Sequence, residues 1–319
     1  MKIQTLLCCA IISVTTACNK QNQTVTFGVI SDVHQDLQHD ATSRMKTFVD
    51  EANLLNPNFI IDLGDMSHST GADTILAQFN KFNGQKYLAF GNHDMDNASK
   101  QTMIEKYKIP QGHYHFDANG VRFIVLDCAF TRKNDSLVDY NHGNYFVNSN
   151  DRDLITPEQI QWVRNLVDTS NLPTIIFSHQ AFDEIGGSVP NRSDFRQMVK
   201  EVNTPNKKIV AAICGHHHID ALSVIDGVNY LQINSASYQW IENGKEYSNG
   251  RMAEYKDPLY AFITVNPAEK TITVKGKTSE YLAPTPKAED FSKEWREQNE
   301  NSNAWQYLDA KISDRTIKW

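Results

Sequence analysis

Cysteine is scarce beyond the first eighteen residues of this 319-residue chain. Of its five cysteines, only Cys128 and Cys214 follow residue 18, and both lie in or beside apolar, strand-like runs. Such positions are typical of buried free thiols, so a disulfide-rich scaffold is excluded. Cys214 comes just before the run Gly215-His216-His217-His218, but nothing around it indicates a nucleophile.

An excess of basic residues is also lacking. Lys and Arg number 31 against 38 Asp and Glu, which gives a formal net charge of −7. A nucleic-acid-binding surface would need a basic stripe, and none is evident. The chain has no internal repeat and no long low-complexity tract. With 40% hydrophobic residues it can bury a large core, which predicts one α/β domain with extensions.

No apolar run near the N-terminus is long enough to span a bilayer. Lys2 precedes a short apolar run over residues 3–14, and Thr15-Thr16-Ala17-Cys18 then resembles a lipobox. We therefore expect residues 1–18 to be a lipoprotein signal peptide, with Cys18 as the lipidated first residue of the mature chain. The protein would be secreted across the inner membrane of a bacterium and held in the periplasm or on the cell surface by its lipid. An ordinary cleaved signal peptide is the alternative.

The remaining chain divides into three predicted parts. Residues 19–24 form a polar tether, residues 25–280 form the main domain and residues 281–319 form a C-terminal extension. That extension is charged, but it carries Trp295, Trp305 and Trp319, which predicts that it packs on the domain. The sequence does not indicate an oligomeric state.

Five polar blocks carry the chemistry, and each follows a short apolar run typical of a buried parallel strand. The blocks are Asp32-Val33-His34, Gly64-Asp65, Gly91-Asn92-His93-Asp94, Ser178-His179 and Gly215-His216-His217-His218. Each block alone is weak evidence, because a lone His or a Gly-Asp pair is common in turns. Ligands bind beyond the carboxyl ends of parallel strands, so together the blocks predict one site.

The side chains in these blocks are carboxylates, an amide and imidazoles. Mg²⁺ and Ca²⁺ prefer shells made of oxygen alone, whereas imidazole suits Mn, Fe, Zn or Ni. There are too many ligands for one tetrahedral ion and enough for two. The composition of the blocks therefore predicts a centre of two divalent transition-metal ions.

The ordered series of blocks, from Asp32 to His218, resembles the calcineurin-like metallophosphoesterase superfamily. The resemblance implies a four-layer α/β/β/α sandwich of two mixed sheets, with the dinuclear site at the carboxyl ends of the strands. It assigns Asp32, His34 and His218 to one ion, Asn92, His179 and His216 to the other, and Asp65 to both. It also places His93 against the substrate as a general acid and makes His217 a spacer that points away.

The implied function is a dinuclear metal-dependent phosphohydrolase that uses metal-activated hydroxide on a small phosphorylated substrate. Purple acid phosphatases have a tyrosine ligand where this chain has His68, and Ser/Thr protein phosphatases have glutamate where it has Asp94. The pattern favours a phosphodiester or nucleotide-type substrate. A broad phosphomonoesterase and a catalytically silent surface-binding lipoprotein are the alternatives.

Four further residues are candidate substrate contacts. His68 stands where relatives place a group that orients the catalytic histidine, and Arg192 could bind a phosphoryl group or simply begin a helix. Tyr238 and Trp240 could stack on a base or cover the core edge. The insertion over residues 130–153 either shapes the substrate pocket or is an unrelated long loop.

Periodicity and turn residues predict the remaining elements. We expect Thr156 to cap a helix whose capping-box partner is Gln159, and Asn119-Gly120 to close a hairpin. Other helices are expected over residues 45–55, 73–82, 99–107 and 193–202. Alternating strands over residues 222–225, 228–233, 260–265 and 271–275 predict a second, antiparallel sheet, with residues 235–250 as a loop.

Overall fold

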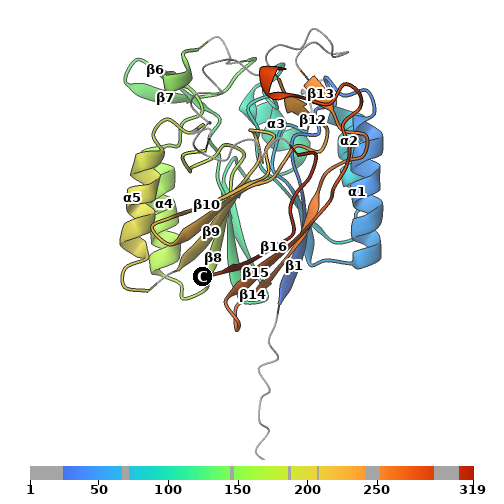
Figure 1. Ribbon diagram of the computed structural model, residues 1–319. Coiled ribbons are helices and arrows are strands. Elements are labelled where there is room, and N and C mark those ends of the chain that lie inside the picture. Colours follow the sequence, from blue (N-terminus) through green and yellow to red (C-terminus); the bar gives the residue numbers. More distant parts are fainter. Residues whose placement is uncertain are drawn as a thin grey trace, which may run out of the picture.

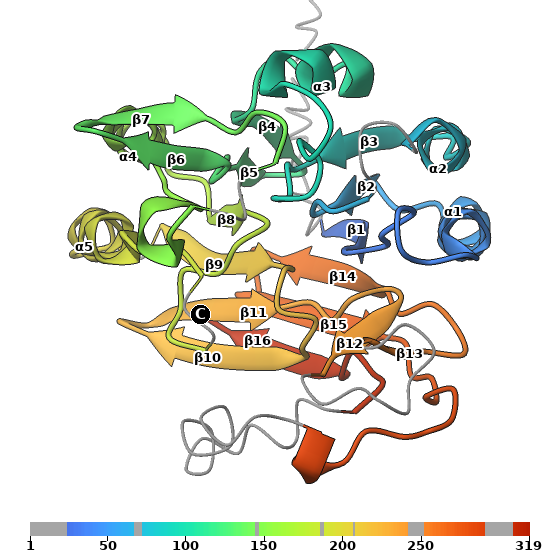
Figure 2. The ribbon, with the colours of Figure 1, turned by 90° about the horizontal axis from the view of Figure 1, so that it is seen from above.

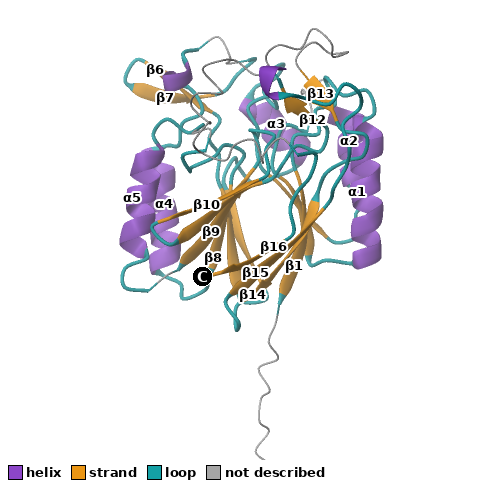
Figure 3. Cartoon of the chain, in the orientation of Figure 1, coloured by secondary structure: helices purple, strands orange, loops and turns teal. Residues whose placement is uncertain are grey.

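The computed structural model describes residues 24–66, 72–143, 147–185, 188–206, 208–241, 252–290 and 309–319. Two six-stranded sheets lie face to face and make up the centre of the molecule. Figures 1 and 3 show helices on both outer sides of the sheets and loops gathered at one end. None of the helices in these ranges has the length and apolar character needed to cross a membrane.

The first sheet has the strand order β16-β15-β14-β1-β2-β3. Strands β1, β2 and β3 are parallel, and β14, β15 and β16 add antiparallel strands beyond β1. Their bounds are Val25–Ile30 (β1), Phe59–Asp62 (β2), Gln85–Leu88 (β3), Ala261–Asn266 (β14), Thr271–Gly276 (β15) and Arg315–Lys318 (β16). The parallel strands β1 and β2 are continuous apolar runs with little exposure, as expected for strands covered on both faces.

The second sheet has the order β10-β11-β9-β8-β5-β4. Strands β5, β8, β9 and β11 run parallel, and the outer strands β4 and β10 are antiparallel to their neighbours. Their bounds are Tyr114–Ala118 (β4), Val121–Val125 (β5), Thr174–Phe177 (β8), Ile209–Cys214 (β9), Ala221–Ile225 (β10) and Val228–Gln232 (β11). As predicted, Asn119-Gly120 joins β4 to β5, and both turn residues have positive φ.

Helices α1 and α2 cover the first sheet, and α4 and α5 cover the second, as the view in Figure 2 shows. The helices are Ala41–Leu55 (α1), Ala72–Phe79 (α2), Lys100–Tyr107 (α3), Pro157–Asp168 (α4) and Arg192–Val202 (α5), with short 3-10 turns at Ser149–Asp151 (η1) and Ala288–Asp290 (η2). These layers confirm the predicted four-layer α/β/β/α sandwich. The helix expected over residues 45–55 starts earlier, at Ala41, and ends before Pro57.

An aromatic cluster joins the two sheets at the centre of the sandwich. The Phe27 ring on β1 stacks on the Phe59 ring of β2 with 4.9 Å between centroids. Its edge contacts reach across to Phe123 on β5 and Phe177 on β8, at 5.7 and 5.5 Å. All four side chains are fully buried, so the packing of this cluster fixes the position of one sheet against the other.

The expected antiparallel second sheet is wrong. The two predicted hairpins form, but β10 and β11 extend the second sheet, whereas β14 and β15 extend the first. Both sheets are therefore mixed. The chain after residue 309 reaches the first sheet as well, where β16 pairs with β15 and Ile312 and Ile317 join the core.

Several local expectations also need correction. Thr156 caps α4 as predicted, but the Gln159 side chain is not its capping-box partner, because it bonds the backbone N–H and C=O of Asp127. The insertion contains a hairpin of Phe130–Lys133 (β6) and Ser136–Asp139 (β7). The expected loop over residues 235–250 begins with Tyr238–Trp240 (β12), which pairs with Met252–Glu254 (β13). Residues 242–251 lie outside the described ranges.

Candidate metal centre

The five polar blocks meet at one end of the sandwich, where β1, β2 and β3 of the first sheet and β8 and β9 of the second end. Backbone hydrogen bonds join neighbouring blocks. Asp32 N–H donates to the Gly64 carbonyl, and Gly215 N–H donates to the His179 carbonyl, each at 3.0 Å. The sequence predicted one shared site at the strand ends, and the structure places the blocks together there.

Asp32, His34 and His218 form the first group of converging ligand atoms. His218 Nε2 lies 3.3 Å from Asp32 Oδ1, and His34 Nε2 lies 4.0 Å from the same oxygen. All three side chains are buried. Asp32 Oδ1 and His34 Nε2 find no hydrogen-bond partner in the described chain. Buried polar atoms normally have partners, so a ligand between them would satisfy this pair.

Asp65, His179 and His216 form the second group. His179 Nε2 lies 3.0 Å from Asp65 Oδ2, 3.2 Å from His216 Nδ1 and 3.1 Å from the amide oxygen of Asn92. Two imidazole nitrogens, a carboxylate oxygen and an amide oxygen thus surround one point. Asp65 Oδ2 also lies 3.8 Å from His34 Nε2 of the first group, so Asp65 stands between the two groups.

Asp32 and Asp65 each turn one carboxylate oxygen toward the centre, because the other oxygen accepts hydrogen bonds from the protein. Asp32 Oδ2 accepts hydrogen bonds from the Ser31 hydroxyl and from His216 N–H, at 2.5 and 3.0 Å. Asp65 Oδ1 accepts His93 N–H at 2.7 Å. These bonds leave Asp32 Oδ1 and Asp65 Oδ2 free to bind a cation.

The imidazoles are oriented in the same way. His179 Nδ1 lies 2.9 Å from the Leu63 carbonyl oxygen and His218 Nδ1 lies 2.8 Å from that of Tyr238. A donated Nδ1–H leaves each Nε2 lone pair facing the centre, the arrangement that metal-binding histidines usually have. Asp36 Oδ1 lies 3.3 Å from His34 Nδ1 and supports that ring from behind.

Strained backbone accompanies these side chains. Asp32, His34, Asp65, His216 and His218 all have φ between 53° and 73°, the left-handed region that residues with a Cβ seldom occupy. Such conformations cost free energy and cluster at functional sites, where the surrounding structure holds them. The strain therefore favours a functional origin for this cluster.

Gly91 and Gly215 allow the loops to approach one another this closely. A Cβ on Gly91 would collide with the backbone N and side chain of Asp65, and one on Gly215 would collide with Ser31 and Asp32. Only glycine, which lacks a Cβ, fits both places.

The charges of the site favour a cation. Burial alone would lower the pKa of His179, but the carboxylates of Asp65 and Asp32 raise it to about 10. Burial opposes ionisation of Asp65, yet His179 and His93 bring its pKa well below the usual value. Burial lowers the pKa of His216 and His218 and outweighs the opposing charge of Asp32, so both rings are neutral and can coordinate. Two ionised carboxylates and the neutral imidazoles of His216 and His218 suit divalent transition metals, and a bound cation would replace the proton that the carboxylates favour on His179.

His93 stands beside this cluster, with its ring 5.2 Å from the His34 ring and 23% of its side chain exposed. Its Nδ1 lies 3.1 Å from Asp96 Oδ2. Burial lowers the pKa of His93, but Asp65 and Asp96 outweigh it and raise the pKa to about 9. A protonated imidazole beside the centre can donate a proton, as expected for a general acid.

Two acidic residues near the centre, Asp96 and Asp94, were given no role from the sequence, although Asp94 belongs to one of the five blocks. Asp96 orients His93, and the His-x-x-Asp spacing within a single turn was the available signal. Asp94 Oδ2 accepts the N–H groups of Gly91 and Asp65, and its Oδ1 accepts the Tyr107 hydroxyl. Burial and the neighbouring Asp65 raise the pKa of Asp94 to about 7. Asp94 thus holds the loops together and does not face the candidate metal sites.

The four candidate substrate contacts have different positions in the structure. His68 lies outside the described residues. Tyr238 is fully buried, and its ring packs against the His34 and His218 rings at 5.4 and 4.7 Å. Tyr238 has no exposed face for a substrate, so of its two expected roles the structure favours packing against the core, where the ring supports the histidines. Trp240 is 37% exposed beside His218 and remains available for stacking.

Arg192 begins α5 and lines a cavity with His216 and His217. His217 is not in either group of converging ligand atoms; its ring lies 4.9 Å from that of His216 and lines this cavity, and its buried Nε2 has no hydrogen-bond partner in the described chain. Burial lowers the pKa of His217 to about 4, which keeps it neutral.

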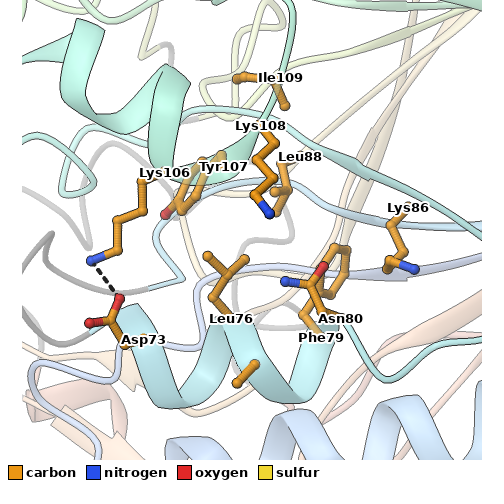
Figure 4. Close-up of a pocket in the computed structure, with 11 residues that line it drawn as sticks. Asp73, Leu76, Phe79, Asn80, Lys86, Leu88, Lys106, Tyr107, Lys108 and Ile109 are labelled. Carbon is orange, nitrogen blue, oxygen red and sulfur yellow. Dashed lines mark ion pairs between the residues drawn. The ribbon is translucent and has the colours of Figure 1, made fainter.

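A separate cavity of about 510 Å³ lies between α2, β3 and α3 (Figure 4). Its floor is apolar, with Leu76 and Phe79, and three lysines stand around it. Lys86 donates to the carbonyls of Phe82 and Gly84, and Lys106 pairs with Asp73. Lys86 and Lys106 thus have partners within the protein, and their positions do not require a bound ligand. None of the candidate metal ligands is among the described residues that line this cavity.

Comparison with known proteins identifies this centre. The family model of calcineurin-like phosphoesterases matches residues 25–220, which include every candidate ligand. The chain belongs to the calcineurin-like phosphoesterase family. Members of this family use two divalent metal ions, and the two ligand groups fit that requirement. The protein is therefore a hydrolase that acts on phosphoester bonds. None of the curated proteins compared with the sequence matches it.

Solved structures share the phosphoesterase fold at low sequence identity. A dimetal phosphatase from Danio rerio has a TM-score of 0.59 at 15% identity, covering 79% of this chain and 95% of its own. The purple acid phosphatase PPD1 of yellow lupin (Lupinus luteus) has a TM-score of 0.52 at 11% identity, covering 80% of this chain and 51% of its own. GAP50, the anchor in the inner membrane complex of Plasmodium, has a TM-score of 0.52 at 10% identity, covering 92% and 97%.

Proposed function

We propose that this phosphoesterase is a catalytically active, dinuclear metal-dependent phosphohydrolase whose ligands are Asp32, His34, Asp65, Asn92, His179, His216 and His218. The observation that carries the proposal is the pair of buried, unpartnered atoms Asp32 Oδ1 and His34 Nε2, with Asp65 Oδ2 between the two groups. Mn, Fe, Zn and Ni all suit this oxygen and nitrogen set. Two bound ions would activate water and neutralise charge on the phosphoryl oxygens.

The chain's own residues have distinct roles in this proposal. The buried carboxylates of Asp32 and Asp65 would hold the ions at the ends of β1 and β2 and so position the reacting phosphoryl group indirectly. His93 donates a proton to the leaving oxygen, and Asp96 keeps its ring oriented. Asn92 would supply a neutral amide oxygen as a ligand. Asp65 is then the only carboxylate among the proposed ligands of the second group.

For the substrate we propose a phosphodiester or nucleotide-type compound, with a broad phosphomonoesterase as the second candidate. Trp240, exposed beside His218, could stack on a base, and Arg192 lies beside His216 where it could contact phosphoryl oxygens. A panel of monoesters, diesters, cyclic nucleotides and nucleotide diphosphates would rank these classes directly.

The proposal is tested by metal analysis and turnover of the purified protein. We expect close to two transition-metal ions per chain and loss of hydrolysis on chelation. Asp65→Asn should deplete both sites, because Oδ2 of Asp65 faces both groups, whereas Asn92→Ala should weaken mainly one. Asp50→Asn, on the exposed side of α1, is the control and should keep both metals. Full activity in metal-free protein would overturn the proposal, and metal binding without turnover of any ester would favour a silent binding protein.

We also propose that Cys18 is lipidated and that the protein is anchored in the periplasm or on the cell surface of a bacterium. The support is the lipobox-like sequence Thr15-Thr16-Ala17-Cys18 after a short apolar run. Cys18→Ser should move the protein from the membrane fraction to the soluble fraction while the turnover number stays the same. A mature N-terminus elsewhere, measured by mass spectrometry, would refute lipidation.

A further inference from the structure

A polar cavity of about 390 Å³ adjoins the metal centre on the side of His216. His216 belongs to the second ligand group and also lines this cavity, so a molecule bound at the centre can extend into it. The other lining residues come from the insertion around η1, from the loop before α5 and from His217. Among the described lining residues, His216 is therefore the only candidate metal ligand.

The charged side chains among the described residues that line this cavity are two arginines, Arg152 and Arg192, and one carboxylate, that of Asp153. Arg152 Nε has no hydrogen-bond partner within the described residues, and the carboxylate paired with it is that of Asp153, whose Oδ2 lies 3.7 Å from this Nε. Asp153 uses its other oxygen to accept the Tyr140 hydroxyl and the Gln180 amide at 2.9 and 2.8 Å. Arg192 bonds the Val189 carbonyl and Glu184, and Glu184 is shared with Arg196. The guanidinium of Arg152 is therefore left with donors to offer a ligand.

The rest of the lining indicates the kind of ligand. Ser149, Asn150 and Ser188 offer neutral polar groups, and among the described lining residues only Pro190 is apolar. No Phe, Tyr or Trp of the described chain lines the cavity, so those residues offer no large ring on which a base could stack. Guanidinium groups present several N–H donors in one plane and suit phosphoryl oxygens. His217 is held beside His216 and contributes a neutral wall.

We propose that this cavity is a subsite for a second phosphoryl group of the substrate, bound by Arg152 and Arg192 while the first phosphoryl group reacts at the metal centre. The inference rests on the proposed function and names its substrate class: compounds that carry two phosphoryl groups. His93, the proposed general acid, stands beside His34 of the first group. The leaving arm of the substrate therefore lies toward His93, and the retained arm carries the second phosphoryl group into the cavity.

Competitive inhibition tests the subsite with matched pairs of ligands. Methylenediphosphonate is compared with methylphosphonate, and thymidine 3′,5′-bisphosphate with thymidine 5′-monophosphate, so that two spacings between phosphoryl groups are covered. With bis(p-nitrophenyl) phosphate as reporter, we expect at least one bisphosphorylated ligand to bind roughly 10- to 100-fold more tightly than its partner. Arg152→Gln and Arg192→Gln should bring that ratio close to one.

Two other arginines provide controls. Arg132→Gln alters a half-exposed arginine of the same insertion, and Arg196→Gln alters the second partner of Glu184, yet neither residue lines the cavity. Both variants should keep the wild-type ratio. A ratio near one at both spacings in the wild type, or a ratio that survives both Arg152→Gln and Arg192→Gln, would overturn the subsite.

Two further outcomes distinguish a subsite for a second phosphoryl group from a site for free phosphate and from an inactive protein. If inorganic phosphate inhibits through these arginines but no bisphosphorylated ligand gains affinity, the cavity binds free phosphate only and the proposal fails. If no ester is hydrolysed, the proposed function fails, and calorimetry with the same ligand pairs then decides the subsite separately. In that case the ratio of dissociation constants must still depend on Arg152 and Arg192 and not on Arg132 or Arg196.

Discussion

At the scale of single residues, each polar side chain of the centre has two polar atoms with different roles. One is hydrogen-bonded to the protein, and the other faces the position of a ligand. Asp32 and Asp65 each give one oxygen to backbone or side-chain donors and keep the other for the centre. His179 and His218 give Nδ1 to carbonyl oxygens and keep Nε2. A substitution that preserves shape but changes this division should therefore affect metal binding more than folding.

His93 provides a test of chemistry without metal binding. His93→Ala removes the proposed proton donor, so the rate on alkyl or nucleoside esters, whose leaving oxygen needs a proton, should fall by roughly 10²- to 10⁴-fold. Nitrophenolate leaves without a proton, so the loss on nitrophenyl esters should be much smaller. Steady-state kinetics on the two ester classes measures the difference.

The control for this variant is metal content, which should match that of the unaltered protein. Asp96→Asn, which removes the negative partner 3.1 Å from His93 Nδ1, should show a weaker form of the same selectivity. Equal losses on both ester classes, together with lost metal, would instead mean that His93 only steadies its loop.

At the scale of elements, a buried lysine joins α3 to the insertion hairpin. Lys100 Nζ lies 2.8 Å from both Asp127 Oδ2 and Asp139 Oδ1, and its side chain is only 4% exposed. The same ammonium group stands 3.4 Å from the centroid of the Phe130 ring on β6. Since α3 follows the loop that carries Asn92 and His93, this contact sets how the insertion lies against the centre.

Lys100→Met should leave the Asp127 carboxylate buried without its partner, which destabilises the fold by about 3–5 kcal/mol. Urea denaturation measures the free energy of unfolding. Lys46→Met removes an exposed helical ion pair and should cost under about 1 kcal/mol. The double variant Lys100→Met/Asp127→Leu should recover much of the loss, and a double variant no more stable than the single one would contradict this account.

Much of the fold and the centre follows from the sequence at this scale, because buried strands and strand-end ligands leave local signals. Apolar runs before Asp32, Asp65 and His179 indicate strands, and the polar residues directly after these runs indicate the end of the sheet at which the site lies. Sheet membership does not leave such a signal. Alternation over residues 222–233 and 260–275 indicates two hairpins but cannot say which sheet each joins, since either edge would bury the same faces.

Other features were missed because they depend on distant packing. Tyr238 looked exposed in a polar segment, yet it pairs with β13 and is buried under two histidines. Gln159 matched a capping box, but the backbone of Asp127 lay within reach and competed for its side chain. The cavity beside His216 combines the insertion with the loop before α5, segments that nothing in the sequence connects.

At the scale of the whole molecule, the centre joins two sheets whose apolar faces pack against each other. The first sheet supplies Asp32, His34, Asp65 and Asn92, and the second supplies His179, His216 and His218. The aromatic cluster around Phe27 holds the sheets together below the centre. At this junction the buried carboxylates of Asp32 and Asp65 repel each other, and the imidazoles of His179 and His218 keep the pKa of Asp32 below its usual value despite burial.

Metal binding should therefore stabilise the folded protein as well as activate it. A ligand that binds only the folded state at 100 times its dissociation constant adds about 2.7 kcal/mol to the free energy of unfolding. We expect EDTA to lower the unfolding midpoint of the wild type while leaving it folded, because the core between the sheets remains. The midpoint of Asp65→Asn should respond little to EDTA, that of Asn92→Ala should respond less than the wild type, and Asp50→Asn should respond fully. If EDTA abolished hydrolysis but left the wild-type midpoint unchanged, the ions would not link the two sheets, and the ligand set drawn from both of them would be wrong.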